Sequence, residues 1–295
     1  RIWAENLGCV LMSDDDVRAE LAALKIELAK IQGQLVQQRV GLEEKLIRAQ
    51  SMVWRKFLAN DLLGSGGDHQ APPRTLPHLL SFEQQMQTLR ARVPEAFDHW
   101  YRLMMEGADV YDGFPVHSCS VDGHVVSPKF ADFILPYLEG NVLDIGCGIQ
   151  PTPQYLKGYP TEKTFGIDPL GDSKDHPFEF YRSVAEFLPW ADDSFGVVVA
   201  ATSLDHVLLL DQALDEVARV LRPGGWFLLW VYFTPGAEEY DPFREGIEPI
   251  DEYHLFHFDQ PWFEQKLNYK FSLGDSHHLM RNGYFADSFY AYQVR

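Results

Sequence analysis

The 295-residue sequence predicts an α/β fold in which a mainly parallel sheet follows a long N-terminal helix. From Asn141 onward, strand-like and helix-like segments alternate, a pattern typical of βαβ units. The first strand ends in a turn that carries Gly146 and Gly148, and a helix is expected to start near Pro153. Between residues 17 and 49, apolar side chains repeat at alternating steps of four and three, which predicts the long helix.

The N-terminal repeat fits an a/d heptad seam with Gln38 and Lys45 as polar interruptions. We interpret it as a coiled coil through which the chain associates with itself as a dimer or trimer. A long amphipathic helix packed on its own domain is the alternative. The expected organisation is a coiled-coil helix at 1–63, a linker at 64–80, a helical and turn-rich lead-in at 81–128, and the α/β domain at 129–295.

Two shorter helices are expected ahead of the sheet. The first covers about residues 81–106 and is interrupted at Pro94, which cannot continue a helix from the preceding residues. The second covers residues 129–138 and leads directly into the first strand. Between them, the stretch 111–128 is rich in turn-forming residues.

Composition narrows the class of function. The formal charge of −18 argues against nucleic acid as a partner, because phosphate contacts supply most of the affinity for it. No apolar run has the length needed to cross a bilayer, so we expect no integral membrane segment. Cys9, Cys119 and Cys147 are odd in number and far apart, which matches neither a disulfide framework nor a CxxC metal site. A cytoplasmic protein is therefore expected.

The stretch "NVLDIGC" and the next strand together indicate a nucleotide-type cofactor. Gly146 and Gly148 let the backbone turn sharply and approach a ligand closely. The following strand, at 163–168, ends in Asp168, about 20 residues further on. At this spacing a carboxylate can accept hydrogen bonds from ribose hydroxyls. These features alone leave a nicotinamide dinucleotide possible.

Two further stretches narrow the choice of cofactor and family. They are "AEFLPWADDSFGVVVAATSLDHV" and "LDEVARVLRPGGWFLL". With "DIGCG" and Asp168, they make the sequence resemble the class I S-adenosylmethionine-dependent methyltransferases. The resemblance covers about 141–231 well, extends toward the C-terminus, and does not cover residues 1–111. It implies a Rossmann-like, seven-stranded sheet with helices on both faces and an antiparallel last strand. It also implies an enzyme that uses S-adenosylmethionine.

Carried over position by position, the resemblance implies a set of cofactor-binding residues. Its members are Asp144, Gly146, Cys147 and Gly148 in the turn, Asp168 and Pro169 at the ribose, Glu186 and Phe187 at the adenine, and Thr202 after the fourth strand. The sequence departs from the family pattern at two positions. Gln150 replaces the third glycine of the loop, and Gly196 replaces an acid that often follows "SF".

His206, in "SLDHV", is the candidate general base for a hydroxyl acceptor. A neutral imidazole is available near pH 7, and the resemblance puts this residue where cofactor and acceptor meet. Asp205 could orient it, although adjacent residues on a strand point to opposite sides. The alternative is that His206 caps the following helix or only fills space.

The segment 245–263 lies between the fifth and sixth strands and is rich in aromatic residues. We interpret Tyr253, His254 and His257, with Tyr232 at the end of the fifth strand, as a wall that binds the acceptor. A helix-and-strand insert with an aromatic core is the alternative. Asp251, His254 and His257 stand at steps of three, but no fourth ligand is evident, so no metal is assigned. His277 and His278 have no assigned role.

The leading hypothesis is O-methylation of a small hydroxylated acceptor, such as a sugar or glycan. A coiled coil attached to a methyltransferase also suits enzymes that work in an assembly, for example in polysaccharide biosynthesis. The alternative is a non-catalytic, methyltransferase-like scaffold that acts through its coiled coil. A nicotinamide dehydrogenase is disfavoured, because "AEFLPWADDSF" and "RVLRPGGW" have no role in one.

Overall fold

The computed structural model describes residues 72–113, 118–281 and 284–295, together with the helical residues 25, 30 and 31. The chain divides into two compact units, Arg1–Trp54 and Arg55–Arg295. Apart from those three helical positions, the predicted coiled coil lies outside the described residues, and so does the first half of the predicted linker. None of the described helices has the length and apolar character that crossing a membrane requires.

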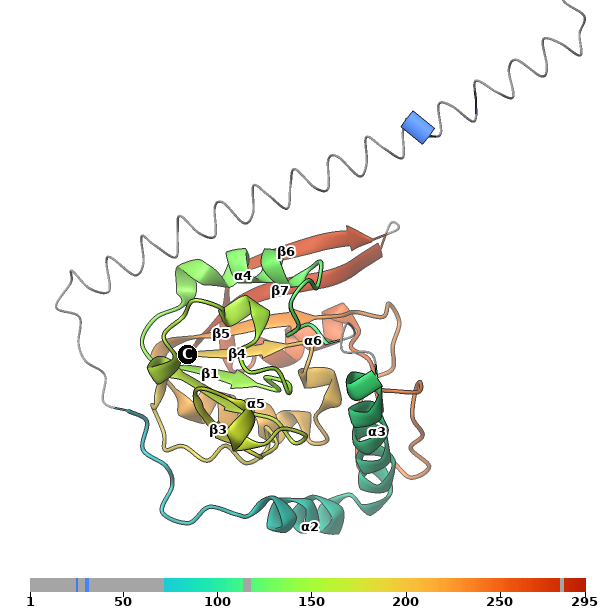
Figure 1. Cartoon of the computed structure of the whole chain (residues 1–295). Helices are drawn as coiled ribbons and strands as arrows, with labels where there is room; N and C mark the ends of the chain where they lie inside the picture. Colours follow the sequence, from blue (N-terminus) through green and yellow to red (C-terminus); the bar gives the residue numbers. More distant parts are fainter. Residues whose placement is uncertain (1–24, 26–29, 32–71, 114–117, 282–283) are drawn as a thin grey trace, which may run out of the picture. The chain divides into compact units, whose positions relative to one another are not determined.

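Within the described residues, seven strands form one mixed sheet in the order β3-β2-β1-β4-β5-β7-β6 (Figure 1). The strands are β1 Val142–Ile145, β2 Thr164–Ile167, β3 Glu179–Tyr181, β4 Phe195–Ala201, β5 Leu221–Val231, β6 Phe271–Arg281 and β7 Tyr284–Val294. Strands β1 to β5 pair in parallel, and β7 pairs antiparallel with both β5 and β6. The predicted Rossmann-like sheet with an antiparallel last strand is confirmed.

Helices cover both faces of this sheet. They are α2 Phe82–Arg92, α3 Pro94–Gly113, α4 Ser127–Ile134, α5 Leu210–Val220 and α6 Gln260–Leu267. Successive side chains of a strand point to opposite faces. Along β4, Val197 and Val199 join the apolar cluster under α4, whereas Val198 and Ala200 join the cluster under α5. All four side chains are buried, as expected for a strand covered on both sides.

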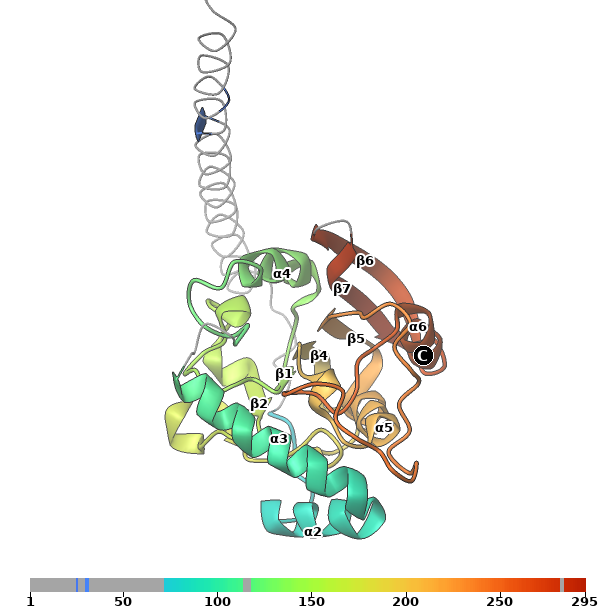
Figure 2. The ribbon, with the colours of Figure 1, turned by 90° about the vertical axis from the view of Figure 1, so that its right-hand side faces the viewer.

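The lead-in folds as two helices with a break at the expected proline. Ser81 and Gln84 form a capping box at the start of α2, with side chain and backbone bonded in both directions. Val93 ends α2, and Pro94 opens α3. Phe97 and Trp100 of α3 are buried in the cluster that also holds α5. Figure 2 shows α3 lying in front of the ends of the strands.

The helix expected near Pro153 is reduced to a single 3₁₀ turn, η3, at Gln154–Leu156. Pro151 and Pro153 lack an N–H, and Gly158 has a φ of 91° just before Pro160. These residues prevent helical hydrogen bonds from continuing beyond one turn. The face beside β1 is covered by α4 instead, where Phe130 packs edge-on against Tyr155 at a ring distance of 5.5 Å.

Gly196 departs from the family pattern for a steric reason. A Cβ at this position would lie 2.9 Å from the backbone oxygen of Glu139 and 3.0 Å from Nη2 of Arg222. A backbone oxygen in a packed strand connection cannot move aside easily. Gly196→Ala is therefore expected to lower the free energy of unfolding by about 1–3 kcal/mol, measured by urea denaturation.

Gly107→Ala is the matched control, because nothing lies within 4 Å of the added Cβ at this helical position. Since alanine favours helix over glycine, the control should raise stability by up to about 1 kcal/mol. Equal effects of the two substitutions would contradict the steric argument.

Candidate active site

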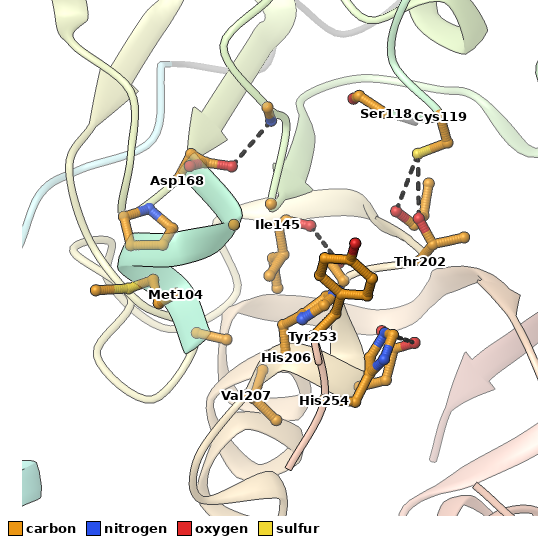
Figure 3. Close-up of a pocket in the computed structure, with 18 of the residues that line it drawn as sticks. Met104, Ser118, Cys119, Ile145, Asp168, Thr202, His206, Val207, Tyr253 and His254 are labelled. Atoms are coloured by element: carbon orange, nitrogen blue, oxygen red, sulfur yellow. Dashed lines mark hydrogen bonds and ion pairs between the residues drawn. The ribbon is translucent and has the colours of Figure 1, made fainter. Parts of the chain in front are cut away.

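The carboxyl ends of β1, β2 and β4 open into a cavity of about 660 Å³ (Figure 3). This is the edge of an open α/β sheet at which ligands bind. Most of the residues predicted for the site line this cavity. Three exceptions are Asp144, Cys147 and Phe187. The cavity is thus the candidate site, and its two ends differ in chemistry.

The turn after β1 requires both of its glycines. Gly146 and Gly148 have φ values of 72° and 73°, in the left-handed region that favours glycine. A Cβ on Gly146 would lie 2.5 Å from Cβ of Ser203, and one on Gly148 would lie 2.8 Å from Oγ of Ser120. The turn therefore presents bare backbone to the cavity, and Gln150 lies on the same wall.

Asp168 directly follows β2, and its carboxylate is held from two sides. Its Oδ2 accepts a hydrogen bond from the N–H of Gly148 at 3.0 Å, and its Oδ1 accepts one from the N–H of Leu170 at 2.8 Å. Burial raises the pKa of Asp168, and these backbone hydrogen bonds act in the opposite direction. A carboxylate has about four lone-pair directions, so acceptor capacity is left for ligand hydroxyls.

Asp144 and Cys147 lie under the turn. Oδ2 of Asp144 accepts a hydrogen bond from the hydroxyl of Tyr155 at 2.9 Å, and its buried Oδ1 has no partner among the described residues. Burial raises the pKa of Asp144 to about 8. The thiol of Cys147 is fully buried, in a cluster with Phe178 and Phe180. Both side chains support the turn from below and are not exposed to the cavity.

The pKa of Asp144 predicts a pH-dependent stability. In the unfolded chain, an aspartate has a pKa of about 3.9 and loses its proton at lower pH than folded Asp144 does. Between these two pKa values the folded state thus binds more protons than the unfolded state. The contribution of Asp144 to the free energy of unfolding is therefore complete below about pH 4 and is lost as the pH rises toward 8. Asp144→Asn removes this titration, whereas the raised pKa of Asp168 remains in both proteins.

The measurement is the free energy of unfolding of both proteins from pH 5 to 8.5. The difference, wild type minus Asp144→Asn, should fall by on the order of a few kcal/mol as the pH rises. A constant difference across this range would show that Asp144 is ionised in the folded protein.

The predicted adenine end is lined by small and apolar side chains, including Leu170, Val184 and Ala185. Glu186 lies beside them, but its Oε1 accepts hydrogen bonds from the N–H groups of Leu208 and Leu209, both at 2.8 Å. Its carboxylate thereby fixes the start of α5. Burial raises the pKa of Glu186. Phe187 is half-buried against the hydrophobic core, outside the cavity lining.

Thr202 follows β4 in a strained conformation. Its φ is 50°, which is uncommon for a β-branched residue. Two hydrogen bonds stabilise this conformation. The N–H of Thr202 donates to the carbonyl of Trp230 at 2.8 Å, and its hydroxyl donates to Sγ of Cys119 at 3.3 Å. Burial raises the pKa of Cys119 to about 12, so it remains a thiol. Strained residues of this kind cluster at functional sites.

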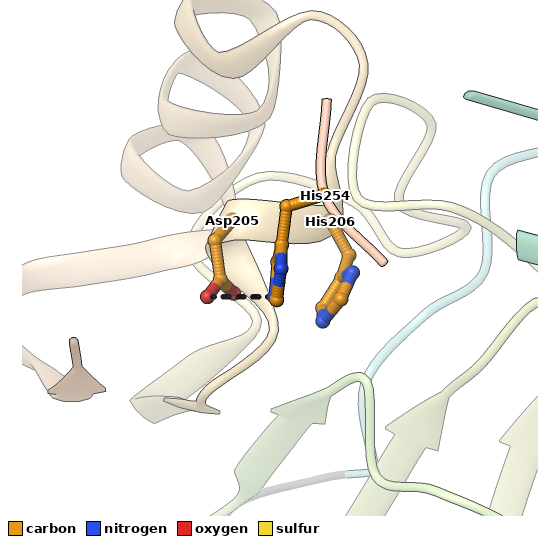
Figure 4. Close-up of side chains that lie close together, drawn as sticks. All are labelled: Asp205, His206 and His254. Atoms are coloured by element: carbon orange, nitrogen blue, oxygen red, sulfur yellow. Dashed lines mark ion pairs between the residues drawn. The ribbon is translucent and has the colours of Figure 1, made fainter. Parts of the chain in front are cut away.

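His206 lies on the 3₁₀ turn η6, Leu204–His206, at the opposite end of the cavity. Its ring stacks on that of His254 at a centroid distance of 4.7 Å and an interplanar angle of 27° (Figure 4). The indole N–H of Trp100, from α3, donates to the carbonyl of His206 at 2.6 Å. Desolvation beside the cavity wall lowers the pKa of His206, and the charge of Asp205 partly offsets this, although the residue remains partly exposed to solvent. Its imidazole is therefore neutral near pH 7.

The segment 245–263, called the insert below, brings the carboxylate of Asp251 to this end of the cavity. Nδ1 of His254 lies 2.9 Å from Oδ1 of Asp251, and Nε2 of His257 lies 2.8 Å from its Oδ2. Burial would raise the pKa of Asp251, but hydrogen bonds from the backbone of Tyr253 and from His254 outweigh it and lower the pKa to about 2. Thr234 Oγ1 lies 3.0 Å from Nδ1 of His257 and fixes its other side. Asp251 is thus the charged centre of a histidine network.

Asp205 is placed differently from the sequence-based expectation. Its Oδ2 lies 3.8 Å from Nε2 of His254, so its nearest histidine nitrogen comes from the insert. Tyr232 and Tyr253 line the cavity and keep 42% and 45% of their surface exposed, as residues at a mouth do.

Several lining residues were missed by the sequence analysis. They are Trp100, Leu103 and Met104 of α3, Ser118 and Cys119 of the turn-rich stretch, and Phe258 of the insert. The lead-in residues lie outside the region that resembles the family. The amphipathic pattern of α3 could have indicated packing against the domain, but not packing against the site.

Residues 143–229, from β1 into β5, match the family model described as a methyltransferase domain. An uncharacterized methyltransferase of Bacillus subtilis, YcgJ, is 30% identical over 123 residues, which cover 38% of this chain and 48% of that protein. The ubiquinone/menaquinone biosynthesis C-methyltransferase UbiE of Hahella chejuensis is 47% identical over 76 residues, covering 24% and 30%. The fatty-acid O-methyltransferase of Mycolicibacterium smegmatis is 35% identical over 109 residues, covering 34% and 38%.

The chain thus spans less than half the length of these relatives. Among solved structures, it is similar to a 1,6-didemethyltoxoflavin-N1-methyltransferase of Burkholderia thailandensis with bound 1,6-didemethyltoxoflavin and S-adenosylhomocysteine. The TM-score is 0.50 at 14% identity, covering 76% of this chain and 99% of the other. At this identity the likeness shows a shared fold.

Proposed function

We propose that this chain is an S-adenosylmethionine-dependent methyltransferase that acts at an oxygen atom of a small hydroxylated acceptor, such as a sugar or glycan. One observation carries the proposal. A single cavity joins the glycine turn and Asp168 at one end to His206 and His254 at the other. The match of residues 143–229 to a methyltransferase domain supports the cofactor assignment.

The cofactor end has the groups that S-adenosylmethionine needs. Gly146 and Gly148 leave the backbone open to its amino-acid part, beside Gln150. Asp168 retains lone pairs for the ribose hydroxyls, and Leu170 and Val184 offer an apolar surface for the adenine ring. When bound, the cofactor supplies a methyl group on a positively charged sulfur, and the new bond to the acceptor forms as the C–S bond breaks with its electron pair retained by sulfur.

The residues of the chain then have two tasks. The first is to align the acceptor with the methyl group, which is orientation work for the rigid ends of β1 and β4. The second is to take the proton of the acceptor hydroxyl, which we assign to the neutral imidazole of His206. Trp100 fixes the backbone of His206, and the stacked ring of His254, held by Asp251, limits its rotation.

The histidine end favours oxygen over carbon as the methylated atom. The relatives include both O- and C-methyltransferases, so their names do not decide the point. A hydroxyl must lose a proton to become a good nucleophile, and His206 and His254 offer nitrogen acceptors next to the cavity. Tyr232, Tyr253 and His257 would contact the acceptor, stacking on a sugar face and exchanging hydrogen bonds with its hydroxyls.

The first test is cofactor binding. S-adenosylmethionine or S-adenosylhomocysteine should raise the melting temperature of the chain, whereas NAD should not. The second test is transfer of a labelled methyl group to a panel of sugars and phenols. A folded chain that binds neither sulfur compound at millimolar concentration would favour the alternative, a non-catalytic scaffold.

Self-association through residues 1–63 is a separate part of the proposal and rests on the heptad repeat. The mass of the full chain in solution, measured by light scattering, tests it. A monomer at every concentration would contradict the coiled-coil interpretation and would leave the methyltransferase proposal untouched.

A further inference from the structure

A buried carboxylate on β7 lines the cavity and has no role in the reaction as proposed so far. Asp287 is only 4% exposed, and its Oδ1 accepts a hydrogen bond from the indole N–H of Trp230 at 3.0 Å. Its other oxygen, Oδ2, has no hydrogen-bond partner among the described residues and is not fully enclosed. Because Asp287 borders the cavity, this oxygen is open to a ligand there. A buried carboxylate with a single neutral donor needs a further partner.

The pairing of the strands brings Asp287 close to the end of β4. Strands β5 and β7 pair antiparallel as far as Val231 and Ser288, so Asp287 lies beside the end of β5. The carbonyl of Trp230, the residue that holds Asp287, accepts the N–H of Thr202 at 2.8 Å. Thr202 directly follows β4, which leads into η6, the turn of the proposed base. The free oxygen thus belongs to the part of the cavity that is proposed to receive the acceptor.

The rings next to this carboxylate do not neutralise its charge. The ring of His124 lies 5.4 Å from that of Trp230, and both residues line the cavity. Nδ1 of His124 accepts hydrogen bonds from the N–H groups of Val126 and Ser127, both at 3.3 Å. A nitrogen that accepts carries no proton, so this imidazole is neutral. Tyr232 follows two residues after Trp230 and adds a ring that is 42% exposed at the cavity.

The described lining of the cavity contains carboxylates but no lysine or arginine. Its acidic residues are Asp168, Glu186, Asp205 and Asp287. The first two accept hydrogen bonds from backbone N–H groups and lie at the end proposed for the positively charged cofactor. Asp205 and Asp287 remain for the acceptor. Carboxylates in a concave wall attract cations and repel anions, so the positive charge has to come from the ligand.

We infer that Asp287 anchors a protonated amine of the acceptor, so that the acceptor carries an ammonium group besides its hydroxyl, as an amino sugar does. The ammonium donates to Oδ2 of Asp287 in a charge-assisted hydrogen bond. The ring of Tyr232 borders the same cavity, and aromatic rings stabilise cations. A neutral hydroxyl can also donate to Oδ2, but it leaves the buried charge uncompensated. The inference rests on the proposed function and narrows its acceptor to cationic compounds.

The test compares ligands that share a ring and differ in charge. The full chain is titrated calorimetrically at neutral pH with two sets: glucosamine, glucose and glucuronate, and tyramine, p-cresol and p-hydroxyphenylacetate. In at least one set, the amine should bind about 10-fold or more tightly than its neutral analogue, and the anion should bind more weakly than both. Each titration is run with and without S-adenosylhomocysteine. A chain that does not bind S-adenosylhomocysteine would contradict the proposed function, and the titrations without it still test the subsite.

Asp287→Asn removes the charge but keeps an oxygen that can accept from Trp230. It should weaken binding of the amine by about 10-fold or more and leave binding of the neutral analogue unchanged. Asp275→Asn is the matched control, because Asp275 is exposed on β6 outside the cavity lining, and it should bind as the wild type does. The melting temperature checks that each variant is folded. Absence of amine binding, an amine affinity no higher than that of the neutral analogue, or unchanged amine affinity in Asp287→Asn would overturn the inference.

Discussion

Asp168→Ala is expected to weaken binding of S-adenosylmethionine and S-adenosylhomocysteine by about 100-fold or more. The substitution removes the carboxylate assigned to the ribose, and it also leaves the N–H groups of Gly148 and Leu170 without their acceptor. Each lost hydrogen bond to a charged group contributes about 1.5–3 kcal/mol, and every 1.4 kcal/mol is a tenfold change in affinity. Isothermal titration of the purified chain measures the loss directly.

Asp172→Ala is the control for this prediction. Asp172 follows the same strand by a few residues, but its side chain is exposed and bonds locally, with Ser173 and Lys174. This variant should keep the affinity of the wild type. Similar affinities for Asp168→Ala and the wild type would remove Asp168 from the cofactor site and would reopen the scaffold alternative.

His206→Ala should slow methyl transfer by about 10²–10⁴-fold, the usual contribution of a general base. Cofactor affinity should stay close to that of the wild type, since His206 lies at the opposite end of the cavity from Asp168. Single-turnover transfer of a labelled methyl group measures the rate, and titration with S-adenosylhomocysteine measures the affinity.

His277→Ala, on the strand β6, serves as the control and should leave turnover unchanged. Unchanged turnover in His206→Ala would show that this histidine does not take the proton in the reaction. Loss of cofactor binding in His206→Ala would instead indicate a structural role for η6.

The half of the cavity that we propose for the cofactor could be predicted because its shape depends on local geometry. A turn at Gly146 and Gly148 needs glycine at both positions, since a Cβ at either would collide with a serine. Asp168 ends the neighbouring parallel strand, so its place beside the turn follows from the register of β1 and β2. In such cases the spacing along the chain fixes the distance in space.

The acceptor half could not be predicted in the same way. Asp205 meets His254 rather than the adjacent His206 because the insert folds back over the end of β4, and no periodic pattern in the insert encodes that path. Trp100 reaches the site because α3 packs beside η6, a contact between segments about 100 residues apart. The missing helix after β1 was a different kind of error. Pro153 is a good first residue of a helix, but Pro151, Pro153 and Gly158 together stop the helical hydrogen bonds from continuing beyond one turn.

Segments from different parts of the chain line the cavity, and this affects how acceptor specificity can change between homologues. The segment that matches the methyltransferase family model, 143–229, supplies the glycine turn and Asp168 proposed for the cofactor, and also Asp205 and His206. Trp100 and Met104 lie before it, and Tyr253 and His254 lie after it. Acceptor preference can thus diverge between homologues while the cofactor half is retained. A chimera that exchanges only the insert, α3 and β7 between two such proteins should carry the acceptor choice with it and leave the methyl donor the same.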